Sequence, residues 1–183
     1  MKKSILSLAL VGLVLMGCKN EQDPFQISKQ HIGLLTDSTK VKDLKAVFVN
    51  DSVVERLLDN EFTFNRTDID IFDKTGNKLL TLTPKNIQDP ESTIETIKVL
   101  DPRFKTTKGV STLSTFGDIE KNYKISSIQN TLKNVVIFVN EINAFFTISK
   151  TELPSELQFD TSAQIDAVHI PEKAKIKYFM VGW

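Results

Sequence analysis

The chain has 183 residues, with 23 basic and 23 acidic side chains, so its formal net charge at pH 7 is zero. This balance argues against the clustered basic face of a nucleic-acid-binding protein, and no nucleic-acid partner is expected. Cys18 is the only cysteine, which excludes an internal disulfide. Twelve Phe residues, with many aliphatic ones, can supply the core of one domain of ordinary size.

The N-terminal segment has the pattern of an export signal. Lys2 and Lys3 precede an apolar run of about a dozen residues, within the ~7–15 of a signal peptide and short of the roughly 20 of a membrane span. Residues 15–18, Leu-Met-Gly-Cys, resemble the lipobox of bacterial lipoproteins, in which the cysteine is acylated after cleavage. We therefore predict a signal peptide over residues 1–17 and lipidation of Cys18, including palmitate. An ordinary cleavage site or a short uncleaved anchor is the alternative.

The residues after Cys18 indicate a destination. In lipoproteins that this segment resembles, an aspartate after the cysteine favours retention in the inner membrane, and Lys19 stands there instead. We expect attachment to the outer membrane of a bacterial envelope, on the periplasmic or the surface face. Residues 18–26 are polar and predict a flexible tether, followed by a single domain over residues 27–183.

Two similar segments predict short helices. Residues 33–39 (GLLTDST) lead into Asp43, Leu44 and Phe48, and residues 109–115 (GVSTLST) lead into a matching set, Asp118, Ile119 and Tyr123. The apolar residues of each set share one helical face. Thr115 and Asp118 have the spacing of a capping box. The similarity suggests two tandem repeat units, about 27–100 and 101–183, and chance likeness of two capped helices is the alternative.

The rest of the chain predicts strands joined by short turns. The expected strands are residues 62–65, 68–72, 79–83, 93–100, 135–139, 144–148 and 176–183, with turns at 73–77 and 140–143. Residues 162–169 predict a further short helix. The order helix, strands, helix, strands predicts an α+β fold, an antiparallel sheet with short helices on one face.

One region carries a family resemblance. Residues 101–110 (DPRFKTTKGV), running into 114–119 (STFGDI) and Asn122-Tyr123, resemble a family of sigma-E-regulated envelope lipoproteins of unknown function. The resemblance lies mainly over residues 93–123 and implies no catalytic residue or cofactor. The two helix-and-sheet units also resemble, in layout alone, the tandem repeats of secreted β-lactamase-inhibitor-like folds.

Residues with reactive side chains lack the spacing of known sites. His31 and His169 form no metal-binding helix motif, and Ser111 lacks the second glycine of a nucleophile elbow. Asp68, Asp70 and Asp73 are interrupted by two apolar residues, unlike a calcium loop, and are expected to face solvent on a strand and a turn. No metal or cofactor is expected.

A small basic loop is the predicted interaction site, made of Arg103, Phe104, Lys105 and Lys108. It could contact lipid headgroups, peptidoglycan or an acidic protein surface, or it could be an ordinary solvated loop. The sequence favours a membrane-anchored, non-enzymatic binding or structural module of the envelope. An envelope hydrolase with dispersed catalytic residues, an inhibitor-like lipoprotein that blocks an exported enzyme, and a small-ligand carrier are the alternatives.

Overall fold

The computed structural model describes residues 22–58 and 66–183. The predicted signal peptide, Cys18 and the predicted strand over residues 62–65 lie outside the described residues. No helix in the described part has the length and apolar character needed to cross a membrane. Residues 22–26, predicted as tether, belong to the folded part, because Phe25 packs on Phe104 and Gln26 lies in a strand.

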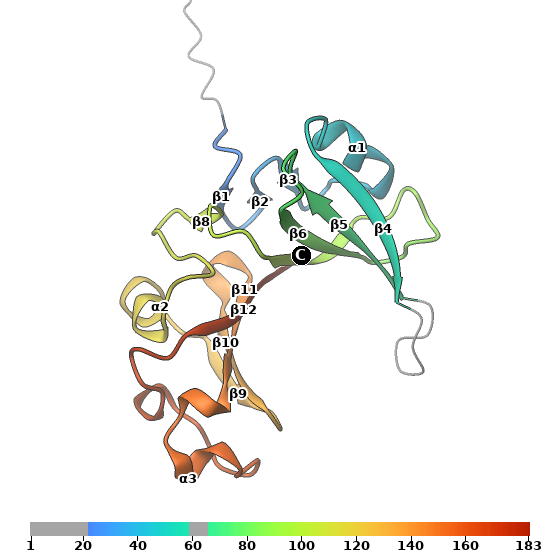
Figure 1. Ribbon diagram of the computed structural model, residues 1–183. Coiled ribbons are helices and arrows are strands. Elements are labelled where there is room, and N and C mark those ends of the chain that lie inside the picture. The colour runs from blue at the N-terminus through green and yellow to red at the C-terminus, as the bar shows by residue number, and fades with distance from the viewer. Residues whose placement is uncertain (1–21, 59–65) are drawn as a thin grey trace, which may run out of the picture.

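The chain forms one large sheet, one small sheet and a few short helices (Figure 1). The large sheet is antiparallel and contains, in spatial order, β4 (Ser52–Leu58), β5 (Arg66–Phe72), β6 (Lys78–Pro84), β7 (Ile94–Val99), β12 (Ile176–Gly182), β11 (Ala144–Ser149), β10 (Asn134–Val139) and β9 (Ser127–Asn130). The small sheet contains β3 (Leu35–Thr36), β2 (His31–Ile32), β1 (Gln26–Ile27) and β8 (Lys105–Thr106), and β1 and β8 are parallel. The helices are η1 (Val41–Asp43), α1 (Leu44–Val47), α2 (Phe116–Asn122), η2 (Asn140–Ile142), η3 (Lys150–Glu152), α3 (Ser155–Gln158) and η4 (Ala167–His169). This architecture confirms the predicted α+β class.

The large sheet consists of two halves with the same order of elements. In the first half α1 is followed by β4, β5, β6 and β7, and in the second half α2 is followed by β9, β10, β11 and β12. The last strands of the two halves, β7 and β12, pair antiparallel at the centre of the sheet. Lys98 faces Met180 there, Ile97 faces Val181, and Phe179 faces Val99. An approximate twofold axis therefore crosses the sheet at the pair Lys98–Met180.

The helices are attached to the sheet in the same way in both halves. The main-chain hydrogen bonds that do this are Val41 N to Ser92 O (2.9 Å) and Lys42 N to Pro90 O (3.1 Å) in the first half, and Phe116 N to Ala174 O (2.9 Å) and Gly117 N to Glu172 O (2.9 Å) in the second. The residue before each helix also forms a single β-bridge with the residue before the last strand, Lys40 with Thr93 and Thr115 with Lys175. The repeat suggested by the sequence is thus matched by the fold.

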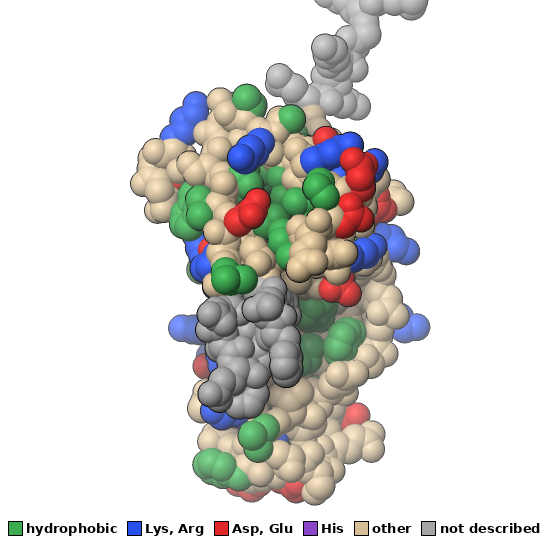
Figure 2. All heavy atoms as spheres, turned by 90° about the vertical axis from the view of Figure 1, so that its right-hand side faces the viewer, with side chains coloured by type: hydrophobic (Ala, Val, Ile, Leu, Met, Phe, Trp, Pro, Cys, Tyr) green, Lys and Arg blue, Asp and Glu red, His purple; other side chains and the backbone are tan. Residues whose placement is uncertain are grey.

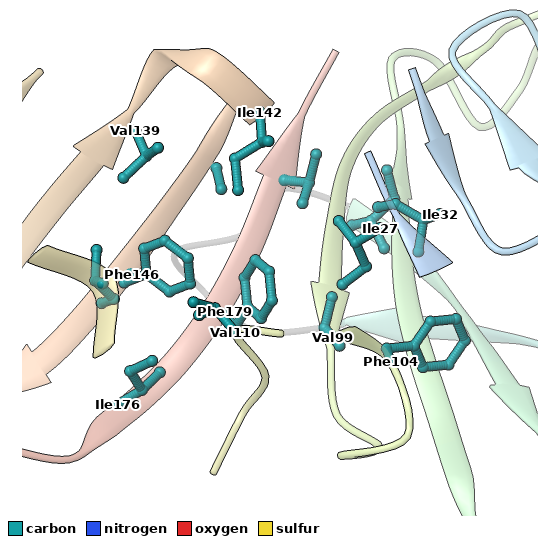
Figure 3. Close-up of a cluster of buried hydrophobic side chains, with 14 of the residues drawn as sticks. Ile27, Ile32, Val99, Phe104, Val110, Val139, Ile142, Phe146, Ile176 and Phe179 are labelled. Carbon is teal, nitrogen blue, oxygen red and sulfur yellow. The ribbon is translucent and has the colours of Figure 1, made fainter. Parts of the chain in front are cut away.

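The hydrophobic core lies between the large sheet and the layer formed by the helices and the small sheet. Because strand side chains alternate between faces, Ile97 and Val99 are buried while Lys98 between them is half-buried. Phe146 and Phe179 pack with their ring centroids 4.6 Å apart. Figure 3 shows this pair on one side of the core, and Ile27 and Phe104 from the small-sheet side near Val99. Both halves therefore contribute to a single core.

The predicted helix over residues 162–169 is wrong for most of its length. Only residues 167–169 are helical, as η4, and α3 lies earlier in the chain. The carboxylate of Asp160 accepts hydrogen bonds from the N–H groups of Ser162 (2.8 Å) and Ala163 (3.0 Å), and Asn130 donates to two main-chain carbonyls of this segment. These contacts hold the backbone in a turn instead of a helix.

Candidate functional site

The face of the large sheet that points away from the core is partly exposed, and it is called the open face below. One row of paired residues crosses it from edge to edge: Val54, Asp70, Thr81, Lys98, Met180, Phe145, Phe138 and Ser127. In Figure 1 the sheet curves, and α1, α2 and the small sheet lie on its other side. Figure 2 views the molecule from the side of β4, with apolar side chains visible in a hollow beside residues drawn in grey.

Asp70 organises the half of the open face that comes first in the chain. Its carboxylate accepts hydrogen bonds from Arg56 Nε (2.8 Å), Lys78 Nζ (2.7 Å) and Thr81 Oγ1 (2.7 Å). Burial alone would raise the pKa of this carboxyl, but the bonds from Arg56, Lys78 and Thr81 outweigh burial and lower it to about 2. The prediction that Asp70 faces solvent is wrong, because the residue is only 2% exposed.

The second half of the open face is aromatic and apolar. Phe138 and Phe145 stack with their centroids 5.9 Å apart, and Met180 is the next residue in the row. All three are partly exposed. The solvent face of an antiparallel sheet usually carries polar residues. Aromatic residues and methionine are instead enriched in protein interfaces, so this cluster is the candidate binding surface.

The centre of the open face joins the two kinds of surface. Lys98 places its Nζ 4.1 Å from the centroid of the Tyr178 ring, a cation–π contact. Among the described residues, Lys98 forms no ion pair. The approximate twofold axis relates Asp70 to Phe138 and Thr81 to Phe145, so equivalent positions carry a charge network on one side and a ring stack on the other.

The first two residues of the predicted interaction loop, Arg103 and Phe104, make contacts within the domain. Arg103 donates to the carboxylates of Asp73 (2.8 Å) and Asp101 (2.8 Å), and its guanidinium lies 4.7 Å from the centroid of the Phe25 ring. These carboxylates, Asp101 first, raise the pKa of Arg103. Phe104 is 2% exposed and meets Phe25 edge to face at 5.1 Å between centroids. A core position leaves Phe104 unable to contact a partner, which corrects this part of the predicted site.

The other two loop residues, Lys105 and Lys108, contact different parts of the molecule. Lys105 is exposed, and its main-chain N–H pairs with Phe25 O (2.9 Å) to join β8 to β1. Lys108 Nζ donates to Asn122 O (2.9 Å), pairs with Glu141 (2.7 Å) and lies 4.4 Å from the Tyr123 ring centroid. Arg103, Lys105 and Lys108 are exposed and Phe104 is buried, so the loop presents cationic side chains without the aromatic one. Contact between a partner and the exposed Lys105 stays a prediction.

The histidines and loop serines are engaged in local contacts. His31 Nδ1 shares a hydrogen bond with Ser28 Oγ (2.7 Å), and His169 Nδ1 accepts one from Asp166 N–H (3.0 Å). Ser111 Oγ accepts from Leu113 N–H at 3.3 Å. Over residues 22–58 and 66–183, no three residues of the types His, Cys, Asp and Glu are grouped to hold a metal ion.

Sequence reasoning missed the open face for an identifiable reason. Residues 135–139 are a continuous apolar run, which predicts a strand buried on both faces, and residues 144–148 are apolar except for Thr147. The register pairs Phe138 with Phe145 on the face opposite Ile137 and Phe146, so only half of each run enters the core. An uninterrupted apolar run in a sheet predicted to be antiparallel was the available signal.

Comparison with known proteins supports the fold alone. No protein-family model matches the chain, and no curated protein matches it. Among solved structures, the uncharacterized protein YfeY from Escherichia coli is similar, with a TM-score of 0.57 and 15% sequence identity over 86% of this chain and 99% of that chain. At this identity the similarity is one of architecture.

Proposed function

We propose that this chain is a lipid-anchored, non-enzymatic binding module of the bacterial envelope, and that its open face holds a protein partner. The observation that carries the proposal is the partly exposed cluster Phe138, Phe145 and Met180 on the side of the sheet that the core does not use. Burial of such a cluster against a partner is favourable, at about 25 cal/mol per Å² of apolar area removed from water. The polar half of the face supplies a rim.

The proposed anchor is an acylated Cys18, in the outer membrane. Each buried methylene of an acyl chain contributes about 0.8 kcal/mol, and two or more chains hold a protein stably on a membrane. Gln22 already contacts the domain, because its side-chain amide donates to Gly33 O at 2.6 Å. Residues 18–21 are therefore what separates the proposed lipid from the domain, which would keep the domain near the membrane surface.

The chemistry of the open face favours binding over catalysis. A general base works best when its pKa lies near the operating pH. The pKa of the Asp70 carboxyl is about 2, and its oxygens already accept bonds from Arg56, Lys78 and Thr81. Asp70 is thus suited to holding its neighbours in place and unsuited to taking a proton from a substrate.

The proposal is tested by changing the two stacked rings together. Lipidated protein immobilised on a membrane support should retain a specific protein from envelope extracts, and F138S/F145S should weaken retention by about tenfold or more, as loss of central aromatic contacts does. Leu113→Ser is the matched control, since Leu113 is an exposed apolar residue in the loop before α2. Thermal unfolding should show that all three proteins are folded.

Two further outcomes separate this proposal from its competitors. If Lys105→Ala abolishes retention and F138S/F145S does not, the basic loop is the binding site and the open-face assignment is wrong. If the protein sediments with peptidoglycan and no protein is retained, the partner class is wrong.

A further inference from the structure

A second concave site lies at the end of the molecule away from residue 22. It has a volume of about 480 Å³ and lies between the β9–β10 turn, the end of β11 with η3, and the residues after α3. Figure 1 shows α3 and the β9–β10 hairpin at the bottom of the view, whereas the first described residues, in blue, lie in the upper part. The volume lies in the ~300–1,000 Å³ range of small-molecule sites.

Two large apolar side chains at this groove are left in water. Phe159 is 87% exposed and Leu132 is 73% exposed, and both line the groove. Neither belongs to the core, so their apolar surface contributes nothing to folding. Covering them with an apolar ligand would remove this surface from water, which is favourable.

The charged residues that line the groove are all cationic. Lys133, Lys150 and Lys177 contribute to the lining, and no Asp or Glu does. Lys177 Nζ donates to Asn134 Oδ1 at 3.2 Å, a neutral acceptor. The electrostatic character of the groove therefore favours an anion.

Lys150 gives the strongest reason to expect that anion. The residue is 3% exposed, and its Nζ donates to the main-chain carbonyl of Asp160 at 2.9 Å. The Asp160 carboxylate accepts from Ser162 Oγ (2.7 Å) and N–H (2.8 Å), and among the described residues Lys150 forms no ion pair with it or any other carboxylate. The charge of Lys150 does help to lower the pKa of the Asp160 carboxyl, so that carboxylate compensates part of the buried charge from a distance. An ammonium has three donors, and a buried charge is costly unless it is directly paired and hydrogen-bonded.

We propose that this groove binds an anionic amphiphile. Its apolar chain would lie against Phe159 and Leu132, and its carboxylate or phosphate head would meet the ammonium groups of Lys133, Lys150 and Lys177. Because the groove and the first described residues lie at opposite ends of the molecule, the proposed occupant is a free amphiphile and not the membrane that carries the proposed anchor. The site is separate from the open face, so its failure leaves the proposed function standing.

Four probes with the same twelve-carbon alkyl chain and different head groups separate the apolar and ionic parts of this site. Residues 19–183 contain every core residue, and this chain is titrated calorimetrically with dodecyl phosphate, dodecanoate, dodecanol and dodecyltrimethylammonium, each below its micelle concentration. We expect one molecule of either anion to bind, and the neutral and cationic probes to bind at least about tenfold more weakly, as loss of a charge-assisted contact implies. Equal binding of all four probes, or no binding of the anions, overturns the proposal.

The site is located with matched substitutions. K133Q/K177Q should weaken dodecyl phosphate binding by about tenfold and flatten its dependence on salt, and Phe159→Ser should weaken all binding. Lys85→Gln and Val168→Ser change an exposed lysine and an exposed apolar residue elsewhere, and should have no effect. Thermal unfolding checks that each variant is folded. If the controls weaken binding as much as the groove variants, or if an acidic peptide binds and the amphiphiles do not, the proposal is wrong.

Discussion

The two halves of the large sheet use the same framework toward the core and different chemistry toward the open face. Ile97 and Val99 in β7 correspond to Phe179 and Val181 in β12, and all four are buried. On the other side of the sheet, the position of Asp70 in the first half corresponds to that of Phe138 in the second. The core positions are constrained by one shared packing problem, whereas the open-face positions are free to differ. The difference between the halves therefore falls on the surface for which we propose a binding role.

The difference also changes how each half is held together on its open side. In the first half, Asp70 draws side chains of β4 and β6 together through charged hydrogen bonds. In the second half, Phe138 and Phe145 meet through stacking across β10 and β11. Cross-strand pairs of either type stabilise a sheet by a few tenths to about 1 kcal/mol. The contacts of Asp70 on the open face should therefore depend on pH, and the stack of Phe138 and Phe145 should not.

The largest expected effect comes from the shared core at the twofold axis. Phe179→Ala should lower the free energy of unfolding by about 3–5 kcal/mol, and the equivalent Ile97→Ala by about 2–5 kcal/mol, because each leaves a cavity in a fully packed core. Urea denaturation of both variants measures this. Both should unfold in a single transition, since the two halves share one core.

Hydrogen exchange tests whether the two halves of the sheet unfold together. In the Phe179→Ala variant, amide protons of β5 and β6 should lose protection together with those of β10 and β11. Protection that falls only in the second half would show that the halves unfold independently, and the single core would then be the wrong description.

A smaller effect is expected from Asp70. The pKa of its carboxyl is about 2 in the folded protein against an ordinary 3.8, so this group stabilises the fold above about pH 4, and the contribution is lost as pH falls through about 2. The shift corresponds to about 2 kcal/mol. Asp70→Asn should therefore be less stable than the parent chain by about this amount at pH 7, and the difference should vanish near pH 2.

The matched variant in the other half is Phe138→Ser, at the equivalent position. It removes no titratable group, so its destabilisation should be the same at pH 7 and near pH 3. A pH-independent effect of Asp70→Asn would show that the hydrogen-bond geometry matters there and the charge does not.

Local signals in the sequence were enough for the central strands. The turn over residues 73–77 and the apolar run 135–139 predicted β5, β6 and β10 closely. The similarity between residues 33–48 and 109–123 predicted a repeat whose equivalent contacts the structure contains. These signals work because hairpins and short capped helices are specified by neighbouring residues.

Features that depend on distant residues could not be predicted in this way. The small sheet pairs β1 with β8, which lie far apart in the chain, and each of these strands has only two residues. Asp70 is buried because Arg56 and Lys78 approach it from the two neighbouring strands, which the alternation of residues 68–72 does not reveal. Phe104 looked like the aromatic member of a basic loop and is a core residue, because the small sheet covers it. Register and tertiary packing decide these positions.

The smallest predicted effect distinguishes the two halves at their helices. Asp118 accepts a hydrogen bond from the Thr115 N–H at 2.8 Å and closes the capping box of α2. Asp43 is the equivalent residue before α1, where Lys40 is the cap of η1 and no side-chain cap bond is formed. Asp118→Ala should therefore lower the free energy of unfolding by about 1 kcal/mol, and Asp43→Ala by less than about 0.5 kcal/mol, in urea denaturation. Equal losses of unfolding free energy would mean that both carboxylates act through the helix dipole, which is present in both halves. The hydrogen bond from the Thr115 N–H to Asp118 would then not be the cause.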